Sequence, residues 1–79
     1  MRLLTLYHRE GCHLCEDMER ELAPLLAARG WRLERVDVDT DPMLARQYGA
    51  EVPVLVHEGR EICRHRLDRA ALEAVLTGP

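Results

Sequence analysis

The stretch EGCHLCEDMERE, residues 10–21, places two of the chain's three cysteines two residues apart, ahead of a run of charged side chains. From Cys12 to Gly30 the apolar residues recur at helical spacing, and charged residues occupy the other faces. The pattern predicts a helix whose first turn holds both cysteines and which Gly30 ends. Because Pro24 lies inside this segment, we expect the helix to be kinked or divided there.

Outward from this helix, apolar runs with strand character alternate with amphipathic segments. Asp41-Pro42 is typical of a helix N-terminus, with the aspartate as the cap. The expected strands cover residues 3–7, 31–39, 52–57 and 60–65, and the expected helices cover residues 12–30, 41–49 and 67–76. The order β-α-β-α-β-β-α predicts one α/β domain, residues 1–79. Its last two strands should form a hairpin, and its third strand should run antiparallel to the first.

Composition and charge exclude several classes of protein. The 79 residues carry a formal net charge of -3, and the 11 basic residues, all arginine, form no basic tract that would indicate nucleic-acid binding. No apolar run approaches the roughly 20 residues of a membrane span, and the short apolar start lacks the features of a signal peptide. We therefore expect a cytoplasmic monomer with no membrane or nucleic-acid partner. An odd number of cysteines in that compartment argues against a structural disulfide framework.

The two cysteines of the first helix are expected to differ in chemistry. Helical positions i and i+3 bring their Cα atoms within disulfide range, so the pair can be oxidised and reduced. Cys12 lies at the helix N-terminus, where unpaired N–H groups and the helix dipole favour a thiolate. Cys12 is therefore the predicted attacking sulfur, and Cys15, one turn further in, is the predicted resolving sulfur.

Charged neighbours tune the reactivity of Cys12. Arg9 and a protonated His13 would stabilise its thiolate, and both are candidate substrate contacts. Glu10 and Glu16 act in the opposite direction. A solvated loop residue is the alternative interpretation of His13, and the sequence leaves the sign of the net effect open.

The Val52-Pro53 pair is the second candidate element of the site. The strand that it opens is expected to pass next to the first strand, so its start should lie near Cys12. We predict a cis bond between the two residues, which would turn the backbone of Val52 toward the thiols. The amide groups of Val52 could then pair with an extended thiol peptide, as in strand addition.

Three segments resemble the glutaredoxin-like branch of the thioredoxin-like fold: YHREGCHLC at residues 7–15, YGAEVPVLV at 48–56 and EGREIC at 58–63. The resemblance covers residues 3–77 and points to a group of small, uncharacterised bacterial proteins. It implies a four-stranded mixed sheet of order 2-1-3-4 and thiol–disulfide exchange with protein or glutathione mixed disulfides. It also implies Cys12 as the nucleophile, Cys15 as its partner and Pro53 as a cis proline facing them. The basic position before the nucleophile corresponds to Arg9.

The chain departs from the glutaredoxin pattern beside the site. His13-Leu14 replaces the usual Pro-Tyr, and Glu51 stands where these proteins carry Thr before Val-Pro. Cys63-Arg64 replaces the Gly-Gly pair that helps to hold the γ-glutamyl end of glutathione. Glu51 would repel this anionic tripeptide, whereas Arg64 and Arg66 could bind its carboxylates. Glutathione is thus retained as a candidate reductant, and no bound cofactor is expected.

Alternative functions use the same cysteines. A zinc site could draw on Cys12, Cys15, His8, His13 and Cys63, but two ligands from one helical turn build only half of such a site, so no metal is expected. A bridging iron–sulfur cluster is less favoured still. A non-catalytic binding module that kept the fold is the other alternative. Cys63 is predicted to be a small apolar residue of a strand, with a third thiol near the site as the alternative.

Overall fold

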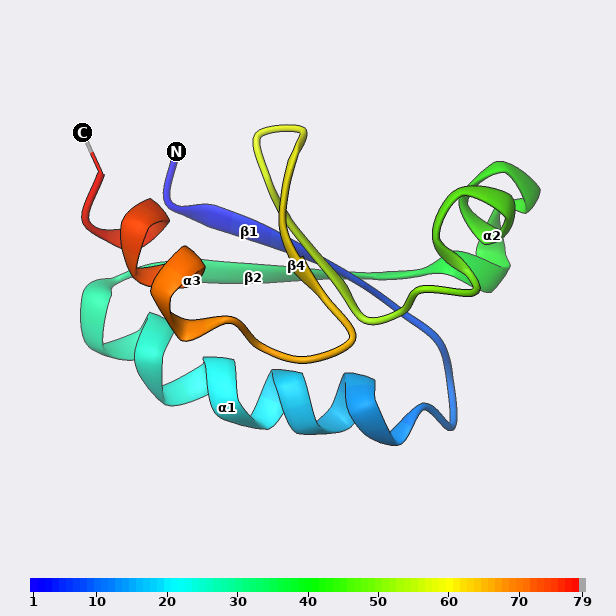
Figure 1. Ribbon diagram of the computed structural model, residues 1–79, viewed down its shortest axis with the longest axis horizontal. Coiled ribbons are helices and arrows are strands. Elements are labelled where there is room, and N and C mark those ends of the chain that lie inside the picture. The colour runs from blue at the N-terminus through cyan, green and yellow to red at the C-terminus, as the bar shows by residue number, and fades with distance from the viewer. Residues whose placement is uncertain (79) are drawn as a thin grey trace.

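The chain folds into four strands and three α-helices, which the computed structural model describes over residues 1–78 (Figure 1). Their order along the chain matches the predicted β-α-β-α-β-β-α order. The elements are β1 (Leu3–His8), α1 (His13–Arg29), β2 (Arg32–Asp37), the 3-10 helix η1 (Val38–Thr40), α2 (Pro42–Tyr48), β3 (Val54–His57), β4 (Arg60–Arg64) and α3 (Arg69–Leu76).

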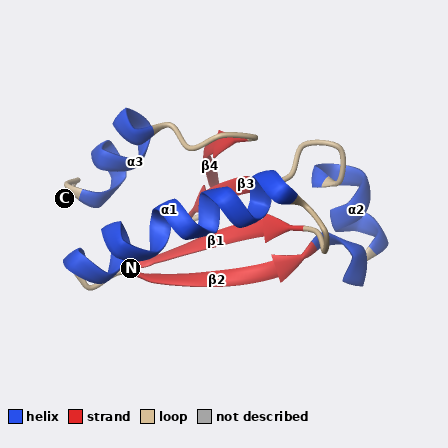
Figure 2. Ribbon diagram, turned by 90° about the horizontal axis from the view of Figure 1, so that it is seen from below, coloured by secondary structure: helices blue, strands red, loops and turns tan. Residues whose placement is uncertain are grey.

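The four strands form one mixed sheet in the order β2-β1-β3-β4 (Figure 2). β2 runs parallel to β1, from Arg32 opposite Leu3 to Asp37 opposite His8. β3 runs antiparallel to β1, and β4 runs antiparallel to β3. The predicted thioredoxin-like fold of glutaredoxin type is therefore confirmed. In this order β1 lies inside the sheet, and its carboxyl end leads directly to the two cysteines.

Two helices, α1 and α3, contribute the side chains that cover one face of the sheet (Figure 2). Alternation along β1 sends Leu4 and Leu6 to this face, where neither is exposed to solvent. They pack with Met18 and Leu22 of α1 and with Leu72 of α3 in one apolar cluster. This burial fixes α1 along the sheet, and so sets where its N-terminus lies.

The helix α2 lies at the end of the sheet, beyond the carboxyl ends of β1 and β2 (Figures 1 and 2). The ring of Tyr48 in α2 stacks on the ring of Tyr7 in β1, with centroids 4.3 Å apart and planes 22° apart. Because Tyr7 alternates with Leu6, it faces away from α1. The two tyrosines therefore pack on each other, and their contact holds the end of α2 against β1.

The helix α1 continues through Pro24, so the expectation of a divided helix is wrong. Pro24 is exposed, and the carbonyl that it leaves without a helical partner can bond to water. Leu22 and Leu26, on either side of it, are buried in the apolar cluster and hold the helix on the sheet. Gly30 ends the helix as predicted, with φ of 71° and its N–H directed at the carbonyls of Ala27 and Leu26.

The second strand is shorter than the sequence predicts. β2 ends at Asp37, and residues 38–40 turn into η1 instead of extending the strand. The Asp37 carboxylate accepts a hydrogen bond from the Asp39 N–H at 2.9 Å, and the Thr40 hydroxyl donates to the Asp37 carbonyl at 2.7 Å. These local bonds replace those of a strand ladder.

β3 begins at Val54 and not at the predicted residue 52, and β4 ends at Arg64, one residue before the predicted end. The cap at Asp41 and the hairpin between β3 and β4 are as predicted. Asp41 accepts a hydrogen bond from Met43 N–H at 2.8 Å at the start of α2, and Asp68 accepts one from Ala71 N–H at 3.0 Å at the start of α3. Between β3 and β4, residues 58 and 59 have φ of 49° and 79°, as a two-residue hairpin turn requires. Within residues 1–78, every helix is too short or too polar to cross a membrane.

The buried face of α1 gives a direct test of the fold. Leu22→Ala should lower the free energy of unfolding by about 2–5 kcal/mol, because it removes apolar contacts and leaves a cavity. Urea or thermal unfolding measures this loss. Leu25→Ala, the same change at a half-buried position of the same helix, is the matched control and should cost less. Equal losses at both positions would contradict the packing described above.

Candidate active site

Cys12 is the N-cap of α1. Its backbone is extended, with φ of -93° and ψ of 106°, and its Sγ accepts a hydrogen bond from the Cys15 N–H at 3.1 Å. Gly11, with φ of 73°, allows the chain to turn between β1 and this cap. A sulfur at this position satisfies an N–H group of the first helical turn and meets the positive end of the helix dipole.

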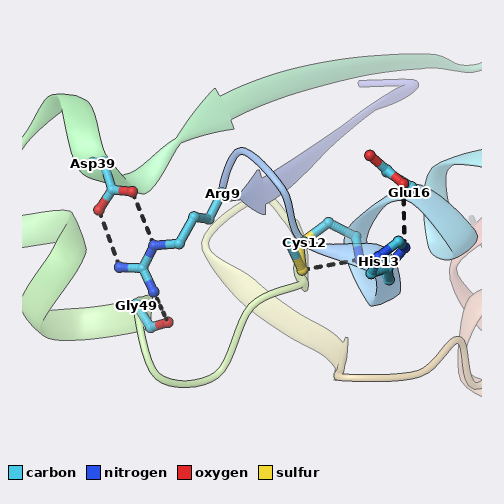
Figure 3. Close-up of a disulfide and its surroundings, with 7 residues drawn as sticks. Arg9, Cys12, His13, Glu16, Asp39 and Gly49 are labelled. Atoms are coloured by element: carbon cyan, nitrogen blue, oxygen red, sulfur yellow. Dashed lines mark hydrogen bonds and ion pairs between the residues drawn. A yellow bond between two sulfur atoms is a disulfide. The ribbon is translucent and has the colours of Figure 1, made fainter.

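The two cysteines differ in burial. Cys15 is 4% exposed, whereas Cys12 is half-buried and open at the end of the helix. Their sulfurs are joined in a disulfide, and their Cα atoms are 5.2 Å apart, within the usual range (Figure 3). The structure therefore represents the oxidised form of the Cys-x-x-Cys pair. It places the less buried sulfur where a second molecule can reach it.

His13 and Arg9, the two basic neighbours, both point away from the sulfur of Cys12. The His13 side chain is 95% exposed, and its Nδ1 lies 3.8 Å from Glu16 Oε1. This is the solvated position that was the alternative for His13. Its role in substrate binding stays a prediction.

The Arg9 guanidinium is bound to two other segments of the chain (Figure 3). Its Nε and Nη2 donate to the two carboxylate oxygens of Asp39 at 2.9 and 3.0 Å, and its Nη1 donates to the Gly49 carbonyl at 2.9 Å. The hydrogen bonds between the two side chains raise the pKa of Arg9 and lower the pKa of Asp39. Neither Asp39 nor Gly49 was singled out from the sequence as part of the site. They lie 30 and 40 residues from Arg9, and no local pattern links them.

The predicted cis bond between Val52 and Pro53 is confirmed. Pro53 is buried, and Val52 is half-buried. The register of β3 on β1 pairs Val54 with Tyr7, so its continuation puts Pro53 opposite His8, close to the loop of Cys12. The topology thus brings this pair to the end of the sheet at which the cysteines lie.

A charged cluster adjoins Pro53, made of Glu51, Glu61, Arg64 and His65. The His65 N–H donates to the Pro53 carbonyl at 2.8 Å, and His65 adopts φ of 68°. Arg64 donates to both carboxylate oxygens of Glu61 at 2.8 and 2.5 Å, and its Nη1 is 3.7 Å from Glu51. Glu51 Oε2 lies 2.6 Å from His65 Nε2. Arg64, a predicted ligand of substrate carboxylates, is therefore already paired.

From the sequence, Glu61 had no predicted role in the site, and His65 was expected at a solvated strand end, with the binding of substrate carboxylates as the alternative. Positions i and i+3 of a regular strand face opposite sides of the sheet, so the spacing of Glu61 and Arg64 did not predict their pairing, which accompanies an irregular register between β3 and β4. The contact of His65 with Glu51 depends on strand register and could not be found locally.

A groove of about 220 Å³ lies between α1 and the segment that follows β4. Residues of α1 form one wall, and residues 65–67 form the other. The α1 wall consists of Leu14, Asp17, Met18 and Glu21. The groove begins at Leu14 in the first turn of α1, the turn that holds both cysteines, although neither cysteine lines it.

Cys63 belongs to the apolar core. It lies on β4 opposite Leu55 and is packed in the cluster formed with α1 and α3. Burial raises the pKa of its thiol. Its predicted role as a small apolar strand residue is confirmed. Within residues 1–78, no three histidine, cysteine or acidic side chains are grouped as metal ligands would be.

The sheet order, the helices on one face and the Cys-x-x-Cys pair at the start of α1 define a thioredoxin-like protein. Thioredoxin 1 of Thermosipho africanus has the same fold, with a TM-score of 0.63 at 18% identity, over 94% of this chain and 93% of its own. Residues 3–77 match the family described as Glutaredoxin-like domain (DUF836). The chain belongs to this family.

Relatives in several bacteria agree with this assignment. An uncharacterised protein of Mycobacterium tuberculosis is 31% identical over 76 residues, which cover 90% of this chain and 78% of the relative. The solution structure of protein Ne2328 of Nitrosomonas europaea is 41% identical and has a TM-score of 0.85, over 96% of this chain and 92% of its own. The X-ray structure of protein XcR50 of X. campestris is 41% identical and has a TM-score of 0.71, over 96% of this chain and 99% of its own.

The pairing of Asp39 with Arg9 predicts a pH-dependent contribution to stability. The pKa of Asp39 is lower in the folded chain than its ordinary value of about 3.9, so the pair stabilises the fold above that pH. The contribution is lost as the pH falls through the folded-state pKa. Asp39→Asn should therefore be less stable than the wild type at pH 7, and the difference should disappear in strong acid.

Thermal unfolding of both proteins between pH 7 and pH 2 measures this difference. Because the pair is exposed to solvent, the difference should be small and should narrow in about 1 M salt. A difference that is constant down to pH 2 would show that the carboxylate charge is not its source.

Proposed function

We propose that this protein is a thiol–disulfide oxidoreductase that reduces disulfides through Cys12 and Cys15. The proposal is carried by the asymmetry of the pair. Cys12 is accessible and accepts the Cys15 N–H at the helix N-terminus, whereas Cys15 is buried beneath it. In the reduced protein the same N–H group and helix dipole would stabilise a Cys12 thiolate, which is the nucleophile of thiol–disulfide exchange.

The reaction consists of two exchanges. In the first, the Cys12 thiolate attacks one sulfur of the substrate disulfide, and the other substrate sulfur leaves as a thiolate that takes a proton from water. In the second, the Cys15 thiol loses its proton to water and its sulfur attacks Cys12 Sγ, which releases the remaining substrate sulfur as a thiolate that takes a proton from water. The substrate gains two electrons and two protons, and the pair becomes the disulfide present in this structure. A thiol reductant, either a small thiol such as glutathione or a reductase dithiol, then regenerates the reduced pair.

Protein disulfides are the substrates that we propose first. Val52 precedes the first residue of β3 that pairs with β1, so its amide groups lie beyond the ladder, where an extended peptide could pair with them. The groove beside Leu14 could take a side chain of the same peptide. Its wall carries both acidic and apolar residues, which suits a basic or apolar side chain.

Glutathione mixed disulfides are proposed as poorer substrates. Arg64 is held by Glu61 and faces Glu51, so its charge is largely neutralised before any tripeptide arrives. The Glu51 carboxylate next to Val52 would repel the carboxylates of glutathione. Glutathione would then act mainly as a reductant of Cys12 mixed disulfides.

Single cysteine variants test the proposed reaction. Cys12→Ser should abolish the reduction of insulin disulfides, because it removes the nucleophile. Cys15→Ser should instead accumulate a covalent Cys12–substrate adduct, because the resolving thiol is missing. Turbidity follows the reduction, and mass spectrometry of acid-quenched samples detects the adduct.

Cys63→Ser is the matched control, because Cys63 is a thiol of the apolar core. It should keep the wild-type rate of insulin reduction. Faster alkylation of Cys15 than of Cys12, or an adduct that forms equally on Cys12→Ser, would overturn the assigned roles. A wild-type protein with no exchange activity would favour a non-catalytic binding module.

The charge of Glu51 tests the proposed substrate preference. Glu51→Gln should raise kcat/KM for a glutathionylated peptide by about two- to fivefold, since a nearby screened charge of like sign is removed. The rate with insulin should change less, so the ratio of the two rates reports the preference. Glu58→Gln, the same charge change at the hairpin tip, should leave the ratio unaltered. An unchanged or lower ratio in Glu51→Gln would refute the role of Glu51 in rejecting glutathione.

A further inference from the structure

Arg9 makes its hydrogen bonds with segments that sequence analysis did not place in the site. Nε and Nη2 bind the two oxygens of Asp39, and Nη1 binds the carbonyl of Gly49. Figure 3 shows the side chain leaving the loop before Cys12 and extending away from the sulfur to these two partners. A planar guanidinium can hold a carboxylate through two nitrogens and still reach a carbonyl with the third, which a lysine ammonium cannot match.

The partners of Arg9 lie on the two segments that flank the site. Asp39 is in η1, which follows β2, and Gly49 ends α2 four residues before Pro53. Arg9 itself stands three residues before Cys12, so one side chain joins the loop of the nucleophile to the chain that leads to Pro53.

The corner around Gly49 has little spare space. Gly49 is buried, and a Cβ atom there would lie 2.9 Å from Arg9 Nη2 and would also meet the Ala45 carbonyl. The lack of a side chain at Gly49 thus leaves room for the Arg9 guanidinium in the position that it occupies. The Arg9 guanidinium is therefore closely packed, and its contacts join the loop before Cys12, η1 and the end of α2.

We infer that Arg9 is a positioning residue for disulfide exchange, which holds the Cys12 loop in place against the segment that leads to Pro53. This inference rests on the proposed function for its effect on turnover. The Asp39 carboxylate neutralises the Arg9 charge, so little of its field remains for a Cys12 thiolate or a substrate carboxylate. Arg9 thus acts through the geometry of the loop and not through its charge.

Two substitutions separate positioning from charge. Arg9→Lys keeps the positive charge but loses the paired hydrogen bonds. Asp39→Asn keeps the size of the partner but removes the charge that neutralises Arg9. If Arg9 positions the loop, both variants should lower kcat/KM for insulin disulfides by about tenfold to a hundredfold, the cost of a small misplacement of reacting groups. If Arg9 acts by charge, Arg9→Lys should keep the wild-type kcat/KM for insulin disulfides, and Asp39→Asn should have a higher kcat/KM than the wild type.

The matched controls are Arg46→Lys, at an exposed arginine of α2, and Glu58→Gln, at the hairpin tip. Both should behave as the wild type. Circular dichroism at the assay temperature verifies that each variant is folded. The alkylation rate of reduced Cys12, measured against pH, should have the same midpoint in Arg9→Lys as in the wild type, because the charge is kept. Turnover should nevertheless fall.

The equilibrium of the Cys12–Cys15 pair with dithiothreitol tests the inference without any protein substrate. A looser Cys12 loop lowers the effective concentration of one thiol at the other, so Arg9→Lys and Asp39→Asn should both shift the equilibrium toward the dithiol, by about threefold to tenfold. An unchanged equilibrium in Arg9→Lys, or an Asp39→Asn enzyme faster than the wild type, would overturn the inference. If the wild type does not reduce insulin, the proposed function is refuted. The equilibrium of the Cys12–Cys15 pair with dithiothreitol would then still test whether Arg9 positions the loop.

Discussion

The hydrogen bond from the Cys15 N–H to the Cys12 sulfur is the interaction on which the site depends. It makes Cys12 the cap of α1, so the start of the helix and the position of the reactive sulfur are fixed together. Moving the cap by one residue would turn both cysteines relative to the sheet. The apolar face of α1 prevents this, because Met18 and Leu22 are already buried against β1. Helix packing and sulfur chemistry are therefore coupled through one turn of backbone.

The position of β1 inside the sheet explains why the site forms at one end of the molecule. Its neighbours on the two sides are β2, which runs parallel to it, and β3, which runs antiparallel. The end of β2 and the start of β3 therefore meet at the carboxyl end of β1, and α2 connects them there (Figure 1). Arg9, the first residue after β1, bonds to Asp39 in η1, just after β2, and to Gly49 at the end of α2, before β3. Arg9 can join the loop after β1 to η1 and to the end of α2 because the strand order brings these three segments to the same end of the sheet.

Charge pairing around the site is nearly complete in the oxidised protein. Arg9 is bound to Asp39, Arg64 to Glu61, and His65 lies against Glu51. Three cations near the site thus lie against acidic side chains of the same chain, whereas Arg66 is exposed and lines the groove beside α1. The pairing of Arg64 and His65 next to Val52 supports the proposed preference for protein disulfides over glutathione.

The sequence by itself determined the elements and the reactive pair, since these depend on neighbours within a few residues. Helical periodicity, the cap at Asp41 and the Cys-x-x-Cys spacing are local, and the cis bond before Pro53 was expected from topology together with family resemblance. Only the tertiary structure decided the early end of β2, the continuity of α1 through Pro24 and the partners of the arginines. An arginine can pair with any acidic residue that the fold brings within reach. Asp39 and Gly49 lie 30 and 40 residues from Arg9, so their contact is fixed by strand order and packing, which no local pattern contains.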